Sequence, residues 1–180
     1  MHDIGMYISR TRFARSSEDA NGLSLIWRQS GNLNLGVRAG VGSLNNASET
    51  VLVGAELNGP LNSLLPGAGV DLAWIVGGGA VFGDDYTLFS LPVGVSVGKR
   101  LGSGSVQILP YVHPRVSFDI VAVDINGNEE TETEASIAVD IGADLNLNDR
   151  FIVRVGGSLV DREAFGVGFA LRWPRPISVR

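Results

Sequence analysis

The residues of this sequence that could do chemistry are charged side chains on one face of alternating segments. Carboxylate and guanidinium groups there could line a water-filled path, bind a charged solute, or neutralise one another. Because a buried charge is tolerated only when it is paired, we expect Arg–Asp/Glu pairs that close an interior, with a narrow water path as the alternative. The set consists of Arg28, Arg38, Glu56, Asp71, Arg115, Asp119, Asp140, Asp144, Arg154 and Arg172.

His113 is one of two histidines and shares its face with Tyr111, Arg115 and Asp119. A histidine beside a carboxylate can act as a general base. The sequence, however, has no G-x-S-x-G nucleophile motif and too few histidines for most histidine metal sites. We therefore predict a hydrogen-bonded interior histidine and no catalytic residue. A membrane hydrolase that uses His113 is the third hypothesis.

Residues 124–129 carry oxygen ligands at the spacing of the first positions of a calcium loop. The sixth position is Glu129 where such a loop needs glycine, and the twelfth is Ala135 where it needs an acid. The pattern therefore favours a solvated acidic loop over residues 125–134. No metal site and no cofactor are predicted.

Composition excludes several classes. The 180 residues fit one domain, contain no cysteine for disulfides or thiolate metal sites, and carry a net charge of −5 that gives no reason to expect nucleic-acid binding. Lys99 is the only lysine, whereas arginine, which dominates, is the residue that interior ion networks favour. No apolar run is long enough for a transmembrane helix, and the sequence contains no export signal.

Alternation and turn residues divide the chain into about ten strand-like segments. From the second segment onward, an apolar face without charged residues opposes a face that carries glycine and charges of both signs; in the first, Arg10 and Arg12 share a face with Met6 and Ile8. The first two are the weakest, so eight strands is the second count. The segments are residues 4–14, 23–27, 33–42, 51–57, 69–82, 89–98, 106–120, 137–147, 151–155 and 164–173.

The last segment indicates which face is outside. Its small face, of glycine and alanine with Arg172, suits a crowded interior, so the large apolar face is predicted to point outward into lipid. The sequence therefore predicts an all-β, closed antiparallel up-and-down transmembrane β-barrel in residues 1–173, followed by a short tail at 174–180. A soluble β-barrel that binds an apolar ligand inside is the second hypothesis.

Strand ends and connections support the membrane interpretation. Short turns are expected after even strands and longer polar loops after most odd ones. Three prolines in two neighbouring strands, Pro92, Pro110 and Pro114, cannot donate to a ladder, so we expect a locally weakened seam there.

Aromatic girdles are predicted near the two rims, at Trp27, Phe151 and Trp173 for one and at Phe82, Tyr86 and Phe118 for the other.

With these patterns, nearly the whole chain resembles the small bacterial outer-membrane β-barrel proteins, the OmpA-, OmpX- and opacity-type group. The resemblance implies a monomer in outer-membrane lipid with a non-enzymatic role: envelope integrity, surface interaction, or slow passage of small solutes. Its sharpest part is similar to the terminal signal that binds the barrel assembly machinery. That signal would comprise Phe165, Val167, Phe169, Leu171 and Trp173, although residues 174–180 follow the final aromatic residue here.

Overall fold

The computed structural model describes residues 2–13, 19–44, 48–67, 69–84, 86–125, 128–148, 150–160 and 162–173. The predicted tail at 174–180 lies outside these residues. Across the described part of the chain, no helix is both long and apolar enough to cross a bilayer. The elements are β1 (His2–Phe13), β2 (Asp19–Gln29), β3 (Asn34–Leu44), β4 (Ser48–Pro60), a 3-10 turn η1 (Asn62–Leu64), β5 (Asp71–Phe82), β6 (Tyr86–Gly98), β7 (Gln107–Ile125), β8 (Asn128–Asn146), β9 (Phe151–Val160) and β10 (Arg162–Trp173).

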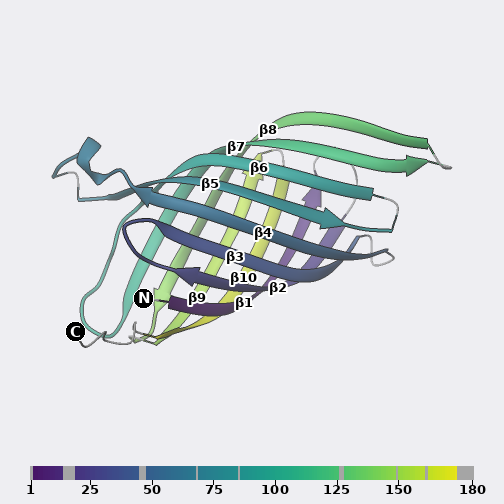
Figure 1. Ribbon diagram of the computed structural model, residues 1–180. Helices are drawn as coiled ribbons and strands as arrows, with labels where there is room; N and C mark the ends of the chain where they lie inside the picture. The colour runs from purple at the N-terminus through teal and green to yellow at the C-terminus, as the bar shows by residue number, and fades with distance from the viewer. Residues whose placement is uncertain are drawn as a thin grey trace, which may run out of the picture.

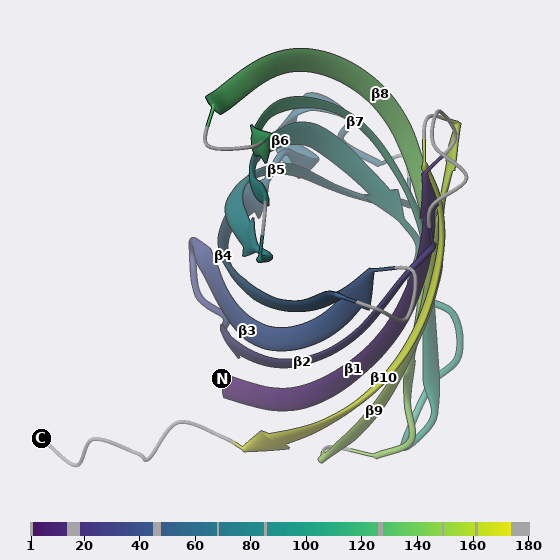
Figure 2. The same cartoon turned by 90° about the vertical axis from the view of Figure 1, so that its right-hand side faces the viewer.

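The ten strands close into a single antiparallel barrel in which each strand pairs with its neighbours in sequence. Closure is made by β1 and β10, which lie side by side in Figures 1 and 2 and pair from His2–Trp173 to Phe13–Arg162. The predicted up-and-down barrel of about ten strands is confirmed. Both weak N-terminal segments form full strands, because each is paired on both sides and does not depend on its own alternation alone.

The pleat sorts side chains as the alternation predicted. In β10, Phe165 is 62% exposed and Phe169 is 45% exposed, whereas Ala170 is 1% exposed. Residues opposite one another in a ladder share a face, so Met6, Phe169 and Val153 all belong to the outer surface. The buried apolar residues among those described are only Ala80, Ala138, Ile152 and Ala170. The described part of the barrel therefore has no large apolar core. Its Val/Leu/Phe face lies outside, whereas the soluble alternative would place that face inside.

The predicted pattern of mostly short turns after even strands and mostly longer loops after odd ones is wrong. The long connection before β5 and the short one before β10 were its expected exceptions, and these two agree with the structure. The end of the barrel that carries both chain termini, here the terminal end, has connections at residues 30–33, 61–70, 99–106 and 147–150. The opposite end, here the hairpin end, has shorter ones at 14–18, 45–47, 83–85, 126–127 and 161. The polar residues expected in loops extend the strands instead.

The acidic loop predicted over residues 125–134 shows how this happens. From Asn128 onward it is strand, paired with β7 in one unbroken register. Thr131 and Thr133 lie opposite Ala122 and Ile120, and β-branched threonine suits such cross-strand positions. The β7–β8 hairpin consequently projects beyond the neighbouring strands (Figure 1). Pairing between β8 and β9 stops at Ala138.

The strand β6 is where pairing is interrupted on both sides. The β5–β6 register skips Pro92, and the β6–β7 register skips Pro114. The missing proline N–H explains both gaps. Pro110 has its place in the β7–β8 register, and its carbonyl accepts a hydrogen bond from the Lys99 amide at 3.1 Å. We call the two gaps that flank β6 the β6 seam.

Candidate functional site

One side of the lumen is lined by ion pairs. Arg154 of β9 donates to both carboxylate oxygens of Asp3 at 3.1 and 3.3 Å, and its Nε donates to Asp144 at 3.2 Å. Arg154 and Asp3 are only 8% and 6% exposed. A guanidinium shared between two carboxylates in this way ties β9 to β1 and β8 through side chains as well as through the ladder. Asp3 escaped the sequence prediction because β1 was the least regular segment.

A second group of ion pairs lies on β7 and β8. Arg115 donates to Asp140 at 2.7 Å through Nε and also to the hydroxyl of Ser117. His113 places Nδ1 3.3 Å from the same carboxylate. We call this group, together with Asp3, Asp144 and Arg154, the paired wall. Four residues of the predicted charge set, Arg115, Asp140, Asp144 and Arg154, come together in it.

The geometry of His113 bears on the hydrolase hypothesis. Its Nε2, the nitrogen that would have to act as base, is buried and has no hydrogen-bond partner among the described residues. A Cβ added at Gly94 would lie 2.6 Å from this nitrogen, so it faces the backbone of β6 rather than open lumen. Nothing in the described part of the chain presents a nucleophile to it.

Other predicted site residues lie apart from the paired wall. Arg172 donates to the amide oxygen of Asn146 at 3.0 Å rather than to a carboxylate. Asp119 is 3% exposed and accepts from the hydroxyl of Ser136 at 3.4 Å. Asp71 is exposed at the start of β5, on the terminal end. The charged residues therefore form several local groups and not one network.

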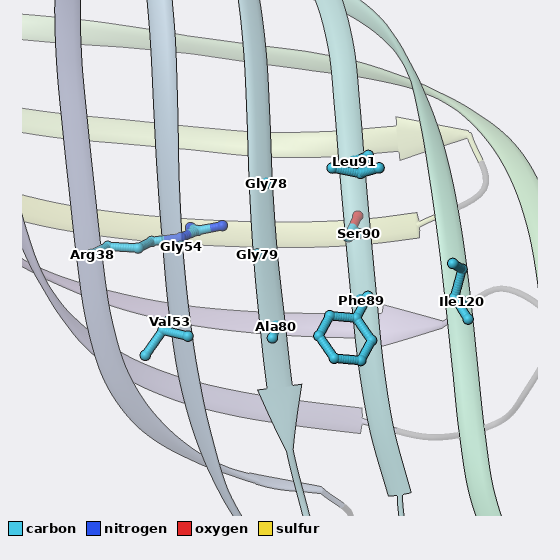
Figure 3. A pocket seen from close by; sticks show the side chains of 10 residues that line it. All are labelled: Arg38, Val53, Gly54, Gly78, Gly79, Ala80, Phe89, Ser90, Leu91 and Ile120. Atoms are coloured by element: carbon cyan, nitrogen blue, oxygen red, sulfur yellow. The ribbon is translucent and has the colours of Figure 1, made fainter.

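The opposite side of the lumen is rich in glycine. We call it the glycine wall; its inward positions on β3 to β6 include Gly36, Gly40, Gly42, Gly54, Gly77, Gly79, Gly94 and Gly98. Arg38 of β3 extends across Gly54, with Nε 3.5 Å from where a Cβ would stand (Figure 3). The same row continues through Gly79 to Ser90. At Gly54 and Gly79 the wall has no inward side chain.

A cavity of about 620 Å³ lies at this thin part of the wall. This pocket is open, and most of its lining is on the outward register, including Val53, Phe89 and Leu91. Arg38, Gly54, Gly79 and Ser90 line it from the inward register (Figure 3). Arg38 is exposed, and the positions beside it in the same row, Gly54 and Gly79, carry no side chain. Glycine thus creates room beside a cation.

Neither Arg28 nor Arg38 has a hydrogen bond or ion pair with any described residue, and the Nε of Arg28 is buried. Glu56 lies on the same wall and accepts from the side-chain amide of Asn58 at 3.4 Å. The prediction that these charges neutralise one another by direct pairing therefore does not describe Arg28, Arg38 and Glu56.

The aromatic residues of the terminal end are on the outer surface. Trp27 stacks on His2 with ring centroids 5.9 Å apart, and Phe151 lies 5.7 Å from Phe169. Trp173 is exposed beside them at the end of β10.

Phe82 and Phe118 also point outward. Tyr86 does not, and its assignment to the girdle is corrected: it pairs with Val123 on the inward register, one residue from the outward Thr87. Its ring packs over Gly83, where a Cβ would meet it. The strand begins at Tyr86, and the parity of the pleat fixes its direction.

The calcium interpretation falls on residues 124–129, whose side chains lie outside the described ones. Within the residues that the structure does describe, no group of three or more histidine or acidic side chains could hold a metal ion. At the hairpin end, Arg10 and Arg12 hold Asp19 at 2.7 and 3.2 Å.

No protein-family model matches the chain, and no curated protein matches its sequence. Several solved structures, all outer-membrane β-barrels, are similar to it. Neisserial surface protein A is 11% identical with a TM-score of 0.44, covering 96% of each chain. The N-terminal barrel domain of Pseudomonas aeruginosa OprF is 10% identical with a TM-score of 0.42, covering 94% of this chain and 96% of that one. The KdgM porin is 9% identical with a TM-score of 0.44, covering 96% and 99%.

Proposed function

We propose that the protein is a non-enzymatic β-barrel of a bacterial outer membrane whose lumen is a narrow path for small solutes. The observation that carries the membrane assignment is the outer surface. Ile8, Phe165 and Ile137 are each at least 60% exposed, and they belong to three different strands. A soluble monomer rarely exposes apolar area on this scale, whereas lipid solvates it without cost.

The dimensions of the strands support the same proposal. The shortest strand, β9, has 10 residues, and about 9–11 tilted residues cross a hydrocarbon layer. Closure of the ladder satisfies the backbone groups within the chain, as a bilayer requires. The outward charged residues Arg10, Arg12 and Asp19 lie at the hairpin end, where the surface would leave the hydrocarbon.

The proposed path follows from the difference between the two walls. Side chains of the paired wall are fixed by mutual hydrogen bonds, whereas the glycines of the opposite wall contribute no side chains to the lumen. Arg38 is exposed although it projects inward. A filled lumen would cover it.

The terminal strand supports a proposed partner. Phe165, Phe169 and Trp173 stand exposed on the outer face of β10, and we propose that the barrel assembly machinery binds this strand before it pairs with β1. Removing the aromatic residue by Trp173→Ala should slow assembly in cells while refolding in detergent proceeds normally.

Detergent dependence and bilayer conductance test the proposed function. We expect the protein to require detergent, to migrate differently in a gel before and after heating, and to give small steady conductance steps in a planar bilayer. A monodisperse monomer without detergent would contradict the membrane assignment. A heat-modifiable barrel without conductance would support the membrane assignment but contradict the proposed solute path.

A further inference from the structure

We propose that Arg28 and Arg38 form an anion-binding site in the lumen that takes the phosphate or carboxylate group of a small solute. This inference deepens the proposed function and rests on it, because the solute must reach the lumen through water. It names the class of solute that the path would hold, which nothing in the fold alone specifies.

The two arginines are placed together by the β2–β3 register. Arg28 lies opposite Gly36, and Arg38 lies opposite Ile26, two positions further along each strand. The aliphatic stem of Arg28 passes 3.6 Å from where a Gly36 Cβ would stand. The charge of Arg38 interacts with those of Arg28 and Glu56. Both guanidinium groups thus project from adjacent strands onto the same side of the lumen.

Among the lumen arginines of the described chain, this pair alone keeps its donors free. Arg115 and Arg154 are bound to carboxylates, and Arg172 is bound to Asn146. Glu56 lies on the same wall and is engaged with Asn58, and the wall's other inward carboxylate, Asp71, is exposed at the start of β5. The arginines of the paired wall are bound to its carboxylates, whereas Arg28, Arg38 and Glu56 together carry one net positive charge.

The shape of the region suits an oxyanion. A guanidinium is a planar set of donors that matches two oxygens of a phosphate or carboxylate. Gly54 and Gly79 leave space beside Arg38, and the hydroxyl of Ser90 closes the far side of that row. The Nε of Arg28, on the neighbouring strand β2, is buried without a hydrogen bond and would be a further donor to such an anion. Unpartnered donors on β2 and β3 therefore adjoin a row of glycines on β4 and β5.

The test is titration of the refolded, full chain with inorganic phosphate and, separately, with acetate, in micelles that contain no phospholipid. Calorimetry would give the affinity, and NMR of the arginine Nε–H groups would identify which arginines respond. We expect saturable binding that shifts Arg28 and Arg38 signals. Arg38→Gln and Arg28→Gln should each weaken it at least about tenfold, because each removes charge-assisted donors.

Arg10→Gln is the matched control, since Arg10 is an exposed arginine bound to Asp19 at the hairpin end; it should leave the affinity unchanged. Acetate alone binding would assign the site to carboxylates. No saturable binding, or an equal loss in the control, would overturn the inference. Heat-modified mobility and conductance, measured on the same samples, show whether the barrel and its path persist when anion binding fails.

Discussion

The paired wall and the glycine wall use the same ladder and the same outer surface, yet they treat charge in opposite ways. On β1, β8 and β9, one arginine is enclosed by two carboxylates at 3.1 and 3.2 Å. On β3 and β4, an arginine lies over glycine with no partner among the described residues. Closure of the barrel evidently does not require that every lumen charge be paired. The ladder provides closure, and the side chains decide what the lumen can hold.

Arg154→Leu should have the largest effect, because it leaves Asp3 and Asp144 buried without a cation. Breaking a buried pair in this way costs about 3–5 kcal/mol. Arg38→Leu is the same substitution on the glycine wall. It removes no ion pair and should change the free energy of unfolding by less than about 1 kcal/mol. Urea unfolding in micelles, followed by tryptophan fluorescence, measures both. Equal losses would show that the two walls do not differ energetically.

A methyl group added at one glycine in each region gives the next largest contrast. Gly168 faces the lumen beside Arg154, whereas Gly78 faces outward on β5, between Gly77 and Gly79 of the glycine wall. At Gly168 a Cβ would collide with the ring of Tyr7, so Gly168→Ala should destabilise the barrel by about 1–3 kcal/mol. At Gly78 the only neighbour within 4 Å is a Leu91 methyl at 3.5 Å. Gly78→Ala should therefore stabilise it by about 0.5 kcal/mol, through the lost freedom of the unfolded chain. The same urea titration measures both changes in the free energy of unfolding. We expect them to have opposite signs, and equal signs would contradict the prediction.

Amide hydrogen exchange compares the β6 seam with the paired wall without any substitution. Amides of Leu91 and of residues 93–95 should exchange about tenfold or more faster than those of residues 152–156, since local opening is easiest where ladder bonds are missing. Both stretches lie within strands, at Leu91–Val95 of β6 and Ile152–Gly156 of β9. Equal protection of the two strands would mean that the proline gaps have no dynamic consequence.

The smallest effect is expected from Arg12→Gln. Arg12 and Asp19 pair at 3.2 Å with much of both side chains in solvent, and Arg10 holds the same carboxylate. Exposed pairs of this kind contribute little. The urea midpoint should stay where it is, and a clear shift would indicate that the hairpin end matters more to stability than either wall.

Alternation alone was enough to predict the strands and their faces, because the pleat has a period of two whatever the neighbours are. It could not predict which charges meet. Asp144 reaches Arg154 through direct register, but Asp3 does so from the other end of the chain, and the stagger of a closed barrel sets that contact. The unpartnered state of Arg38 depends on the same stagger.

The ends of the strands also could not be predicted from the sequence. Polarity predicted a loop where Thr131 and Glu132 continue β8, because a hairpin needs only cross-strand partners and not burial. The assignment of Tyr86 to the aromatic girdle was wrong for a related reason: proximity to a rim does not determine on which side of the sheet an aromatic ring lies.

The projecting part of β8 has a consequence for how copies of this protein meet in a membrane. In the described chain, residues 128–136 have β7 as their only strand partner, which leaves one edge of the ribbon open to pairing with another chain. Glu130 and Glu132 stand exposed along that edge. Two copies approaching edge to edge at neutral pH would oppose like charges and stay apart. Acidification or a divalent cation would remove that repulsion, so solitary barrels should become associated ones under those conditions, as chemical cross-linking of the refolded protein would reveal.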